Sequence, residues 1–243
     1  MNEMKTFLFD LGNTRLKFAE LGVDGHPAET TAVVHDDGHA WLDGLPRGDV
    51  ACIASVVGPG SRHVALLEGL ARRFTRLHVV RTQPVLGRLR IAYGNPQHLG
   101  VDRFLTLLAA VDAGPALLVG VGTALTCDLL DRDGQHRGGR IAPSPMLMRQ
   151  ALHARAPVLP DHGGNYAEFA DDTDHALASG CEGAALALVE RSLAEAQRLL
   201  GVRPALWLHG GGAQALRTRL PAHEWVPDAV LRGLARWHAH CIA

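Results

Sequence analysis

The sequence has little of what marks nucleic-acid-binding, secreted or membrane proteins. Its 24 basic and 25 acidic residues give a formal net charge of -1, and no long block of like charge favours nucleic acid or an anionic membrane as partner. The four cysteines lie far apart without a C-x-x-C pair, which indicates reduced structural thiols. The first apolar run is cut by Asp10 and is too short for a signal peptide or a membrane span. We therefore expect a cytoplasmic protein that binds neither nucleic acid nor membrane.

The chain is also poor in lysine and tyrosine. Only two of its 24 basic residues are lysine, Lys5 and Lys17, and it has only two tyrosines, of which Tyr93 precedes a Gly-x-Pro turn. A chain that otherwise uses arginine carries one ammonium group shortly after a glycine turn. This choice favours a specific role for Lys17 as a point charge.

Hydrophobic residues make up 47% of the 243 positions, enough for one large domain or two small ones. Two segments share one shape: residues 7–18 and 116–131 each place an apolar strand before a glycine turn and a second, alternating strand. Superposing the turns sets Gly12 on Gly122, at a spacing of 110 residues. The repeat predicts a duplicated α/β unit.

We place the boundary of the two halves at residue 114, so that they cover residues 1–114 and 115–243. Hydrophobic periodicity predicts further elements in both halves. These are strands at 50–57, 77–82 and from 205, and helices at 61–74, from Gly100, at 145–155 and from Asp174 or Glu182 to Leu200. Residues 138–164 are interpreted as a Gly/Pro-rich stretch around the helix at 145–155.

The first turn combines groups that bind phosphate. Backbone N–H groups around Gly12 and Asn13 can point at one anion, while Thr14 adds a hydroxyl and Lys17 an ammonium. Asp10 would hold Mg²⁺ or its water shell on the same phosphates. The alternative is an ordinary hairpin in which Asn and Thr only make the turn.

A second group of candidate residues lies at the start of the helix that follows Gly100. Asp102 and Arg103 fall in its first turn, where an acid is favoured by the helix dipole even without any function. In a functional role, the ionised carboxylate of Asp102 could accept a hydroxyl proton, and the guanidinium of Arg103 could hold an anionic substrate. Tyr93 lies nearby in sequence.

Three weaker signals come from the second half. Gly122-Thr123 repeats the first turn and could hold a polyphosphate, or could be structural. Gly210 to Gly212 would let a nucleoside approach the backbone, although tight packing explains glycines there equally well. Thr173 alone indicates a helix cap.

Five motifs in order and spacing resemble those of type III pantothenate kinases, in the superfamily of actin and the sugar kinases. They are D-x-G-N-T-x-x-K (10–17), Y-x-N-P-x-x-L-G-x-D-R (93–103), G-T-A-x-T-x-D (122–128), G-G-R-I (138–141) and T-x-x-A-x-x-S-G (173–180). The resemblance covers nearly the whole chain. It implies a duplicated RNase H-like, actin-like ATPase fold with ATP in the interdomain cleft. It also implies a homodimer that phosphorylates the primary hydroxyl of pantothenate with ATP and Mg²⁺, the first step of coenzyme A biosynthesis.

Carried over residue by residue, the resemblance assigns roles to the motif positions. ATP would be bound by Asp10, Leu11, Gly12, Asn13, Thr14, Arg15, Leu16, Lys17 and Thr123. Pantothenate would be bound by Tyr93, Gly100, Val101, Asp102, Arg103 and Thr173, with Asp102 as proton acceptor and Thr173 reaching across the dimer interface.

One position departs from the family pattern. The family usually has an aspartate, associated with a bound K⁺ or NH₄⁺, where this chain has Gly120. Asp128 and backbone carbonyls are the possible substitutes as ligands of a monovalent cation. Two other functions stay open at this point: a kinase for another small hydroxy-substrate, and a non-catalytic accessory factor for transcription. Asp10, Lys17, Asp102 and Arg103 are all present, which favours catalysis.

Overall fold

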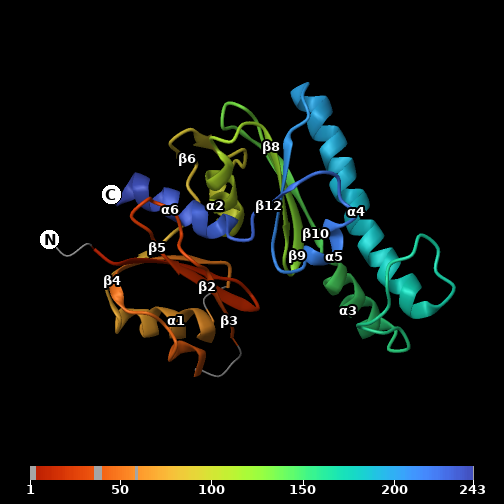
Figure 1. Cartoon of the computed structure of the whole chain (residues 1–243), viewed down its shortest axis with the longest axis horizontal. Coiled ribbons are helices and arrows are strands. Elements are labelled where there is room, and N and C mark those ends of the chain that lie inside the picture. Colours follow the sequence, from red (N-terminus) through yellow and green to blue (C-terminus); the bar gives the residue numbers. More distant parts are fainter. Residues whose placement is uncertain (1–3, 36–39, 58–59, 243) are drawn as a thin grey trace. The chain divides into compact units, whose positions relative to one another are not determined.

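The chain divides into two compact units. The computed structural model describes residues 4–35, 40–57 and 60–242 (Figure 1). Unit 1 holds the residues up to Asp112 together with those from Asp228 onward, and unit 2 is Ala113–Pro227. None of the helices in this described part of the chain has the length and apolar character needed to cross a membrane.

Unit 1 is built on a five-stranded sheet in the order β3-β2-β1-β4-β5. The first three strands are antiparallel, and β4 and β5 run parallel to β1. Helix α1 covers one face of the sheet, and α2 and α6 cover the other (Figure 1). The elements are β1 (Thr6–Leu11), β2 (Arg15–Glu20), β3 (Thr31–Val34), η1 (Ala40–Leu42), β4 (Gly48–Ser55), α1 (Ser61–Ala71), β5 (Phe74–Val79), the hairpin β6 (Val85–Leu86) and β7 (Leu89–Arg90), η2 (Pro96–His98), α2 (Val101–Ala110) and α6 (Ala229–Cys241).

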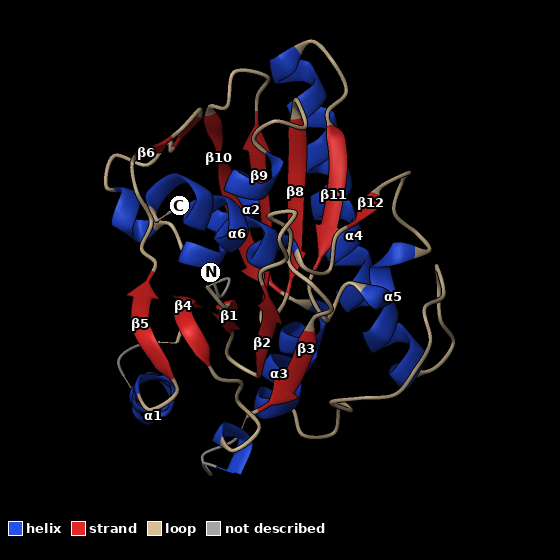
Figure 2. Ribbon diagram, turned by 60° about the vertical axis from the view of Figure 1, so that its left-hand side comes forward, coloured by secondary structure: helices blue, strands red, loops and turns tan. Residues whose placement is uncertain are grey.

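Unit 2 repeats this design. Its sheet has the order β10-β9-β8-β11-β12, again with three antiparallel strands followed by two parallel ones (Figure 2). Helix α4 packs on the face formed by alternate residues of β8 and β9. The elements are β8 (Ala116–Val121), β9 (Ala124–Leu130), β10 (His136–Pro143), α3 (Pro145–Arg155), α4 (Thr173–Leu200), β11 (Ala205–His209), α5 (Gln214–Arg217) and β12 (Glu224–Trp225).

The two sheets match strand for strand. Strands β1 and β8 have the same length and begin 110 positions apart, at Thr6 and Ala116. The predicted duplication is therefore present, and the shared strand order is that of the RNase H-like fold. The fold class predicted from the sequence is confirmed.

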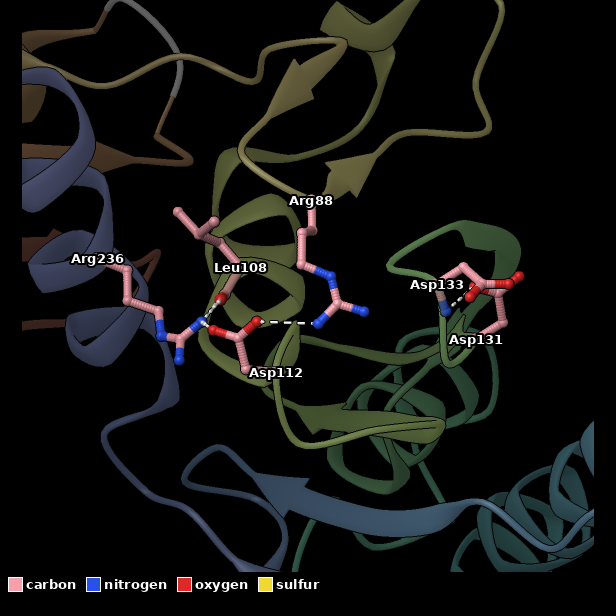
Figure 3. Close-up of polar contacts among 6 residues, drawn as sticks. All are labelled: Arg88, Leu108, Asp112, Asp131, Asp133 and Arg236. Carbon is pink, nitrogen blue, oxygen red and sulfur yellow. Dashed lines mark hydrogen bonds and ion pairs between the residues drawn. The ribbon is translucent and has the colours of Figure 1, made fainter.

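The last helix corrects the predicted division into halves. Residues 228–243, which the sequence analysis assigned to the second half, pack in unit 1 because α6 lies against α2. Gly233 permits the close approach, since a Cβ there would stand 2.1 Å from the carbonyl oxygen of Leu105. Figure 3 shows Arg236 of α6 donating to the carbonyl of Leu108 (3.4 Å) and to the carboxylate of Asp112 (2.6 Å).

Strand β10 was missed in the sequence. Its segment was interpreted as a Gly/Pro-rich stretch, but it pairs with β9 across a register shift between His136 and Gly139. Gly138 lies at this bulge with φ of 99°, a left-handed conformation that glycine adopts without a steric penalty. The β9–β10 turn is closed by Asp131, whose carboxylate accepts the backbone N–H of Asp133 (Figure 3).

Candidate active site

Strand alternation directs Asp10 and Lys17 to the same face of the first sheet. Phe7, Phe9 and Leu11 of β1 join the core cluster under α1, so the intervening Asp10 points to the opposite face, which α2 and α6 cover. Asp10 and Lys17 are register partners on β1 and β2. Their carboxylate and ammonium groups therefore lie side by side at the end of the strand pair.

The turn between these strands is tight and open to solvent. The N–H of Gly12 donates to the carbonyl of Arg15 at 3.0 Å, and Asn13, Thr14 and Arg15 are exposed. An exposed turn with polar residues suits a ligand better than a core contact. The geometry fits the predicted phosphate-binding turn, whose role stays a prediction.

His35 contacts this turn, and the sequence analysis missed it. It follows β3, is buried to 4% exposure and bonds through Nε2 to the carbonyl of Gly12 at 2.8 Å. Because a carbonyl only accepts, Nε2 carries the proton. The ring packs against Trp41 with centroids 5.6 Å apart. No local sequence motif predicts this contact, because the acceptor is the backbone carbonyl of Gly12, which lies 23 residues earlier in the chain.

The loop before α2 is held by side-chain hydrogen bonds to the backbone. Asn95 accepts the N–H of Gln97 and caps η2, and Thr82 donates to the carbonyl of Leu99 at 2.8 Å. At Gly100 a Cβ would stand 2.6 Å from Oδ1 of Asp102. Glycine at this position therefore leaves room for the carboxylate to fold back over the start of the helix.

Tyr93 and Arg103 meet beside this carboxylate. The buried Arg103 donates to the hydroxyl of Tyr93 at 3.3 Å, and its guanidinium lies 5.8 Å from the ring centroid. The structure thus brings Tyr93, Gly100, Asp102 and Arg103 together at the start of α2, and their role in binding a substrate stays a prediction. A guanidinium is a group that recognises a carboxylate or phosphate through its planar fork of N–H donors.

Two carboxyl groups meet in unit 1. Burial and, to a lesser extent, the charge of Asp102 raise the pKa of Asp10 to about 7, although the charge of Lys17 acts to lower it. One ammonium therefore does not compensate for the burial and for the second carboxylate. A divalent cation, which prefers carboxylate oxygens, would relieve this repulsion, so Asp10 fits the predicted Mg²⁺ ligand.

Within the described ranges, no group of three or more His, Cys, Asp or Glu side chains is arranged to hold a metal ion. A cation at Asp10 would therefore take most of its ligands from water and phosphate oxygens. Mg²⁺ is commonly bound in this way, through one or two carboxylates plus the phosphates of a nucleotide.

In unit 2, the turn between β8 and β9 resembles the turn between β1 and β2 of unit 1. The N–H of Gly122 donates to the carbonyl of Ala124 at 2.9 Å, and Thr123 is exposed. Gly210, with φ of 96°, packs on the end of β8, where a Cβ would stand 2.4 Å from the carbonyl oxygen of Val121. Close packing therefore accounts for Gly210, the second of the two explanations considered for the glycine run.

Thr173 is not a helix cap. The N-cap of α4 is Asp172, whose carboxylate accepts the N–H of His175 at 2.9 Å, and Thr173 is the exposed first residue of the helix. Asp is as good a cap as Thr, and the sequence alone did not separate the two. The predicted contact of Thr173 with pantothenate stays a prediction.

We expect Asp10→Asn to stabilise the free protein in a pH-dependent way. The pKa of Asp10 is raised from 3.8 to about 7 in the folded chain, so the folded parent loses stability as pH rises from about 4 to about 7 and stays at that lower level above it. The amide does not ionise, so its advantage should grow over the same interval, by up to about 4 kcal/mol. Urea unfolding without Mg²⁺ or nucleotide measures it.

The matched control is Asp133→Asn, at an exposed turn residue in unit 2. Its unfolding free energy should follow that of the parent at every pH. An Asp10→Asn variant whose difference from the parent does not change between pH 4 and pH 8 would show that the Asp10 carboxyl is not desolvated.

Comparison with known proteins agrees with this geometry. A family model described as type III pantothenate kinase matches residues 6–195. A type III pantothenate kinase of Stenotrophomonas maltophilia (strain K279a) is 56% identical over 241 residues, 98% of each chain. One of Xanthomonas campestris pv. campestris (strain B100) is 52% identical over 244 residues, 99% of this chain and 100% of the relative.

The fold is shared with a solved structure. A conserved Campylobacter jejuni protein assigned to the Baf family of transcriptional activators superposes with a TM-score of 0.63, over 96% of this chain and 97% of that chain, at 19% identity. At this identity the likeness concerns the fold alone. On the family model and the curated relatives, the chain belongs to the type III pantothenate kinase family.

Proposed function

We propose that the chain transfers the γ-phosphoryl group of ATP to the primary hydroxyl of pantothenate, giving 4'-phosphopantothenate, the first step of coenzyme A biosynthesis. Family membership supports the reaction. The observation that carries it is the meeting of three charged groups in unit 1: Asp10 beside Lys17 across the strand pair, and Asp102 close enough for its charge to raise the pKa of Asp10.

In this proposal the first turn binds the phosphates. Backbone N–H groups of the exposed turn and the Lys17 ammonium stabilise the charge on the transferring phosphoryl group. The residues assigned to ATP are Asp10, Leu11, Gly12, Asn13, Thr14, Arg15, Leu16, Lys17 and Thr123. Mg²⁺ bound with Asp10 would neutralise phosphate charge.

Pantothenate is assigned to the start of α2. Its carboxylate would pair with Arg103, which Tyr93 orients, and its hydroxyl would lie against Asp102. Gly100 and Val101 line the same helix start. Phosphoryl transfer passes through a loose transition state, so Asp102 needs only to position the hydroxyl and accept its proton late.

The direct test adds pantothenate to the purified chain with Mg²⁺ and ATP and follows ADP release, with phosphorus NMR of the product. We expect ADP to form in step with a phosphomonoester on pantothenate. If the rate of ADP formation does not depend on pantothenate but does depend on another hydroxy compound, the assignment of pantothenate as the substrate is contradicted.

Asp102→Asn should separate catalysis from binding. Asn keeps the size of the side chain and is tolerated at a helix start, but its amide cannot accept the proton. We expect kcat to fall by roughly 10² or more with ATP affinity nearly unchanged. A variant with the parental kcat and pH profile would reduce Asp102 to a helix-start residue.

His35 should act on the phosphate turn without touching substrate. His35→Phe keeps a ring against Trp41 but removes the Nε2 donor to Gly12, and His35→Gln keeps an N–H in a similar place. We expect Phe to raise the KM for ATP by about tenfold, leaving the KM for pantothenate unchanged, and Gln to restore part of the loss. Equal effects of both variants on both substrates would indicate a general packing role.

We further propose that the active form is a homodimer in which Thr173 of the partner subunit completes the pantothenate site. Thr173 is exposed, and the nearby surface of α3 and α4 is apolar. A hollow there is lined by Pro143, Met148, Ala151, Leu152, Ala176, Leu177, Gly180 and Cys181. Met146 and Leu152, both on α3, are exposed large hydrophobic residues. Exposed apolar patches of this kind mark interaction surfaces.

Complementation tests this arrangement. Asp102→Asn and Thr173→Ala chains should each be weakly active alone. Co-expressed, about half of their dimers are mixed, and each mixed dimer has one intact site, so roughly a quarter of the parental activity should return. If no activity returns although both variants are folded and dimeric, a site shared between subunits is contradicted.

A further inference from the structure

Gly120 is a glycine because its neighbours fill the space of a side chain. On β8 its register partners are Thr126 of β9 and His209 of β11. A Cβ at Gly120 would stand 2.9 Å from Cε1 and from Nε2 of the His209 ring, and 2.9 Å from Oγ1 of Thr126. Gly120 is not among the glycines with positive φ, so the constraint comes from the imidazole and the hydroxyl and not from the backbone.

Comparison of the two duplicated sheets shows that the polar group beside the phosphate turn lies on a different strand in each unit. In unit 1 the equivalent position is Asp10, whose register partners are Lys17 and Ala54. The polar group of unit 1 is thus carried by the central strand, with a small residue on the parallel neighbour. In unit 2 the central strand has the glycine, and the parallel neighbour carries the imidazole of His209.

These residues do not fit the monovalent cation that the family resemblance implies. Hard cations take oxygen ligands, but no carboxylate stands at position 120, and the adjoining volume holds an imidazole ring. Asp128, the substitute considered from the sequence, is buried and bonded to Nε2 of His136 at 3.0 Å. The oxygen donors left beside Gly120 are the uncharged Thr126 hydroxyl and backbone carbonyls, and with an imidazole ring in the adjoining volume they suit K⁺ or NH₄⁺ less well than the aspartate of the family does.

We infer that the imidazole of His209 takes the place of the cation-binding carboxylate and its ion, so that this chain binds ATP and turns over without K⁺ or NH₄⁺. His209 is the last residue of β11. The turn that follows it is tied to the second phosphate turn through the N–H of Gly212, which donates to the carbonyl of Val121 at 2.9 Å. The ring therefore lies beside the end of β8 that leads into the second phosphate turn, where it can hold that turn in place for ATP. The inference rests on the proposed function.

The first experiment compares chloride salts of K⁺, NH₄⁺, Na⁺ and choline at equal ionic strength. ATP affinity is measured by calorimetry and turnover by ADP release with pantothenate. We expect both to agree within about twofold across the salts. An increase of about tenfold in ATP affinity or in rate with K⁺ or NH₄⁺ over choline would overturn the inference. The calorimetric measurement distinguishes failure of this inference from failure of the proposed function, because it measures the effect of the cation on ATP affinity even if pantothenate is not the substrate.

The second experiment removes the ring. His209→Ala should weaken ATP binding by about tenfold, as expected for loss of a hydrogen bond to a charged ligand, while His209→Gln, which keeps an N–H, should bind more tightly than the Ala variant. The matched control is His223→Ala, at a partly buried histidine elsewhere in unit 2, which should bind ATP like the parent. A folded His209→Ala variant with parental ATP affinity would overturn the inference. If that variant does not fold, the salt series on the parent still decides.

Discussion

The candidate site depends on one electrostatic constraint, a carboxyl group held at the partly buried end of a strand without enough positive charge. The alternation of β1 directs Asp10 away from the phenylalanine-rich core and toward the face covered by α2. There the loss of water and, after it, the charge of Asp102 raise the pKa of Asp10, and Lys17 offsets only part of the effect. Such a site is unfavourable in the free protein and becomes favourable with a cation and phosphates bound, as functional sites often are.

The duplicated fold makes this constraint asymmetric. Both units have the same strand order and a turn of the same form after their first strand. The first turn carries a carboxylate and an ammonium, whereas the second carries a glycine packed under an imidazole. One backbone frame thus supports two different sets of polar groups, which agrees with the general finding that chemistry is determined by the site and not by the fold.

The sequence predicted the parts of the structure that depend on local pattern. The two hairpins, the helix at 145–155 and the position of Asp102 in the first turn of α2 follow from alternation, periodicity and turn residues. Strand β10 was missed because its glycines indicate a loop until pairing with β9 supplies the bulge. The place of α6 against α2, and the bond of His35 to Gly12, depend on contacts between distant segments. A pattern within one short segment of the sequence does not predict such contacts.

The pKa of the Asp10 carboxyl is the quantity that tests this account most directly. It can be measured by carbon-13 NMR of the labelled aspartate side chain, assigned with Asp10→Asn, in the free protein without Mg²⁺. We predict a value of about 7, a lower value in Asp102→Asn because a neighbouring negative charge is removed, and a much lower value with Mg²⁺ and a nonhydrolysable ATP analogue bound. A pKa close to 3.8 in the free protein, unchanged in Asp102→Asn, would show that the two carboxyl groups do not share a site and would contradict the account.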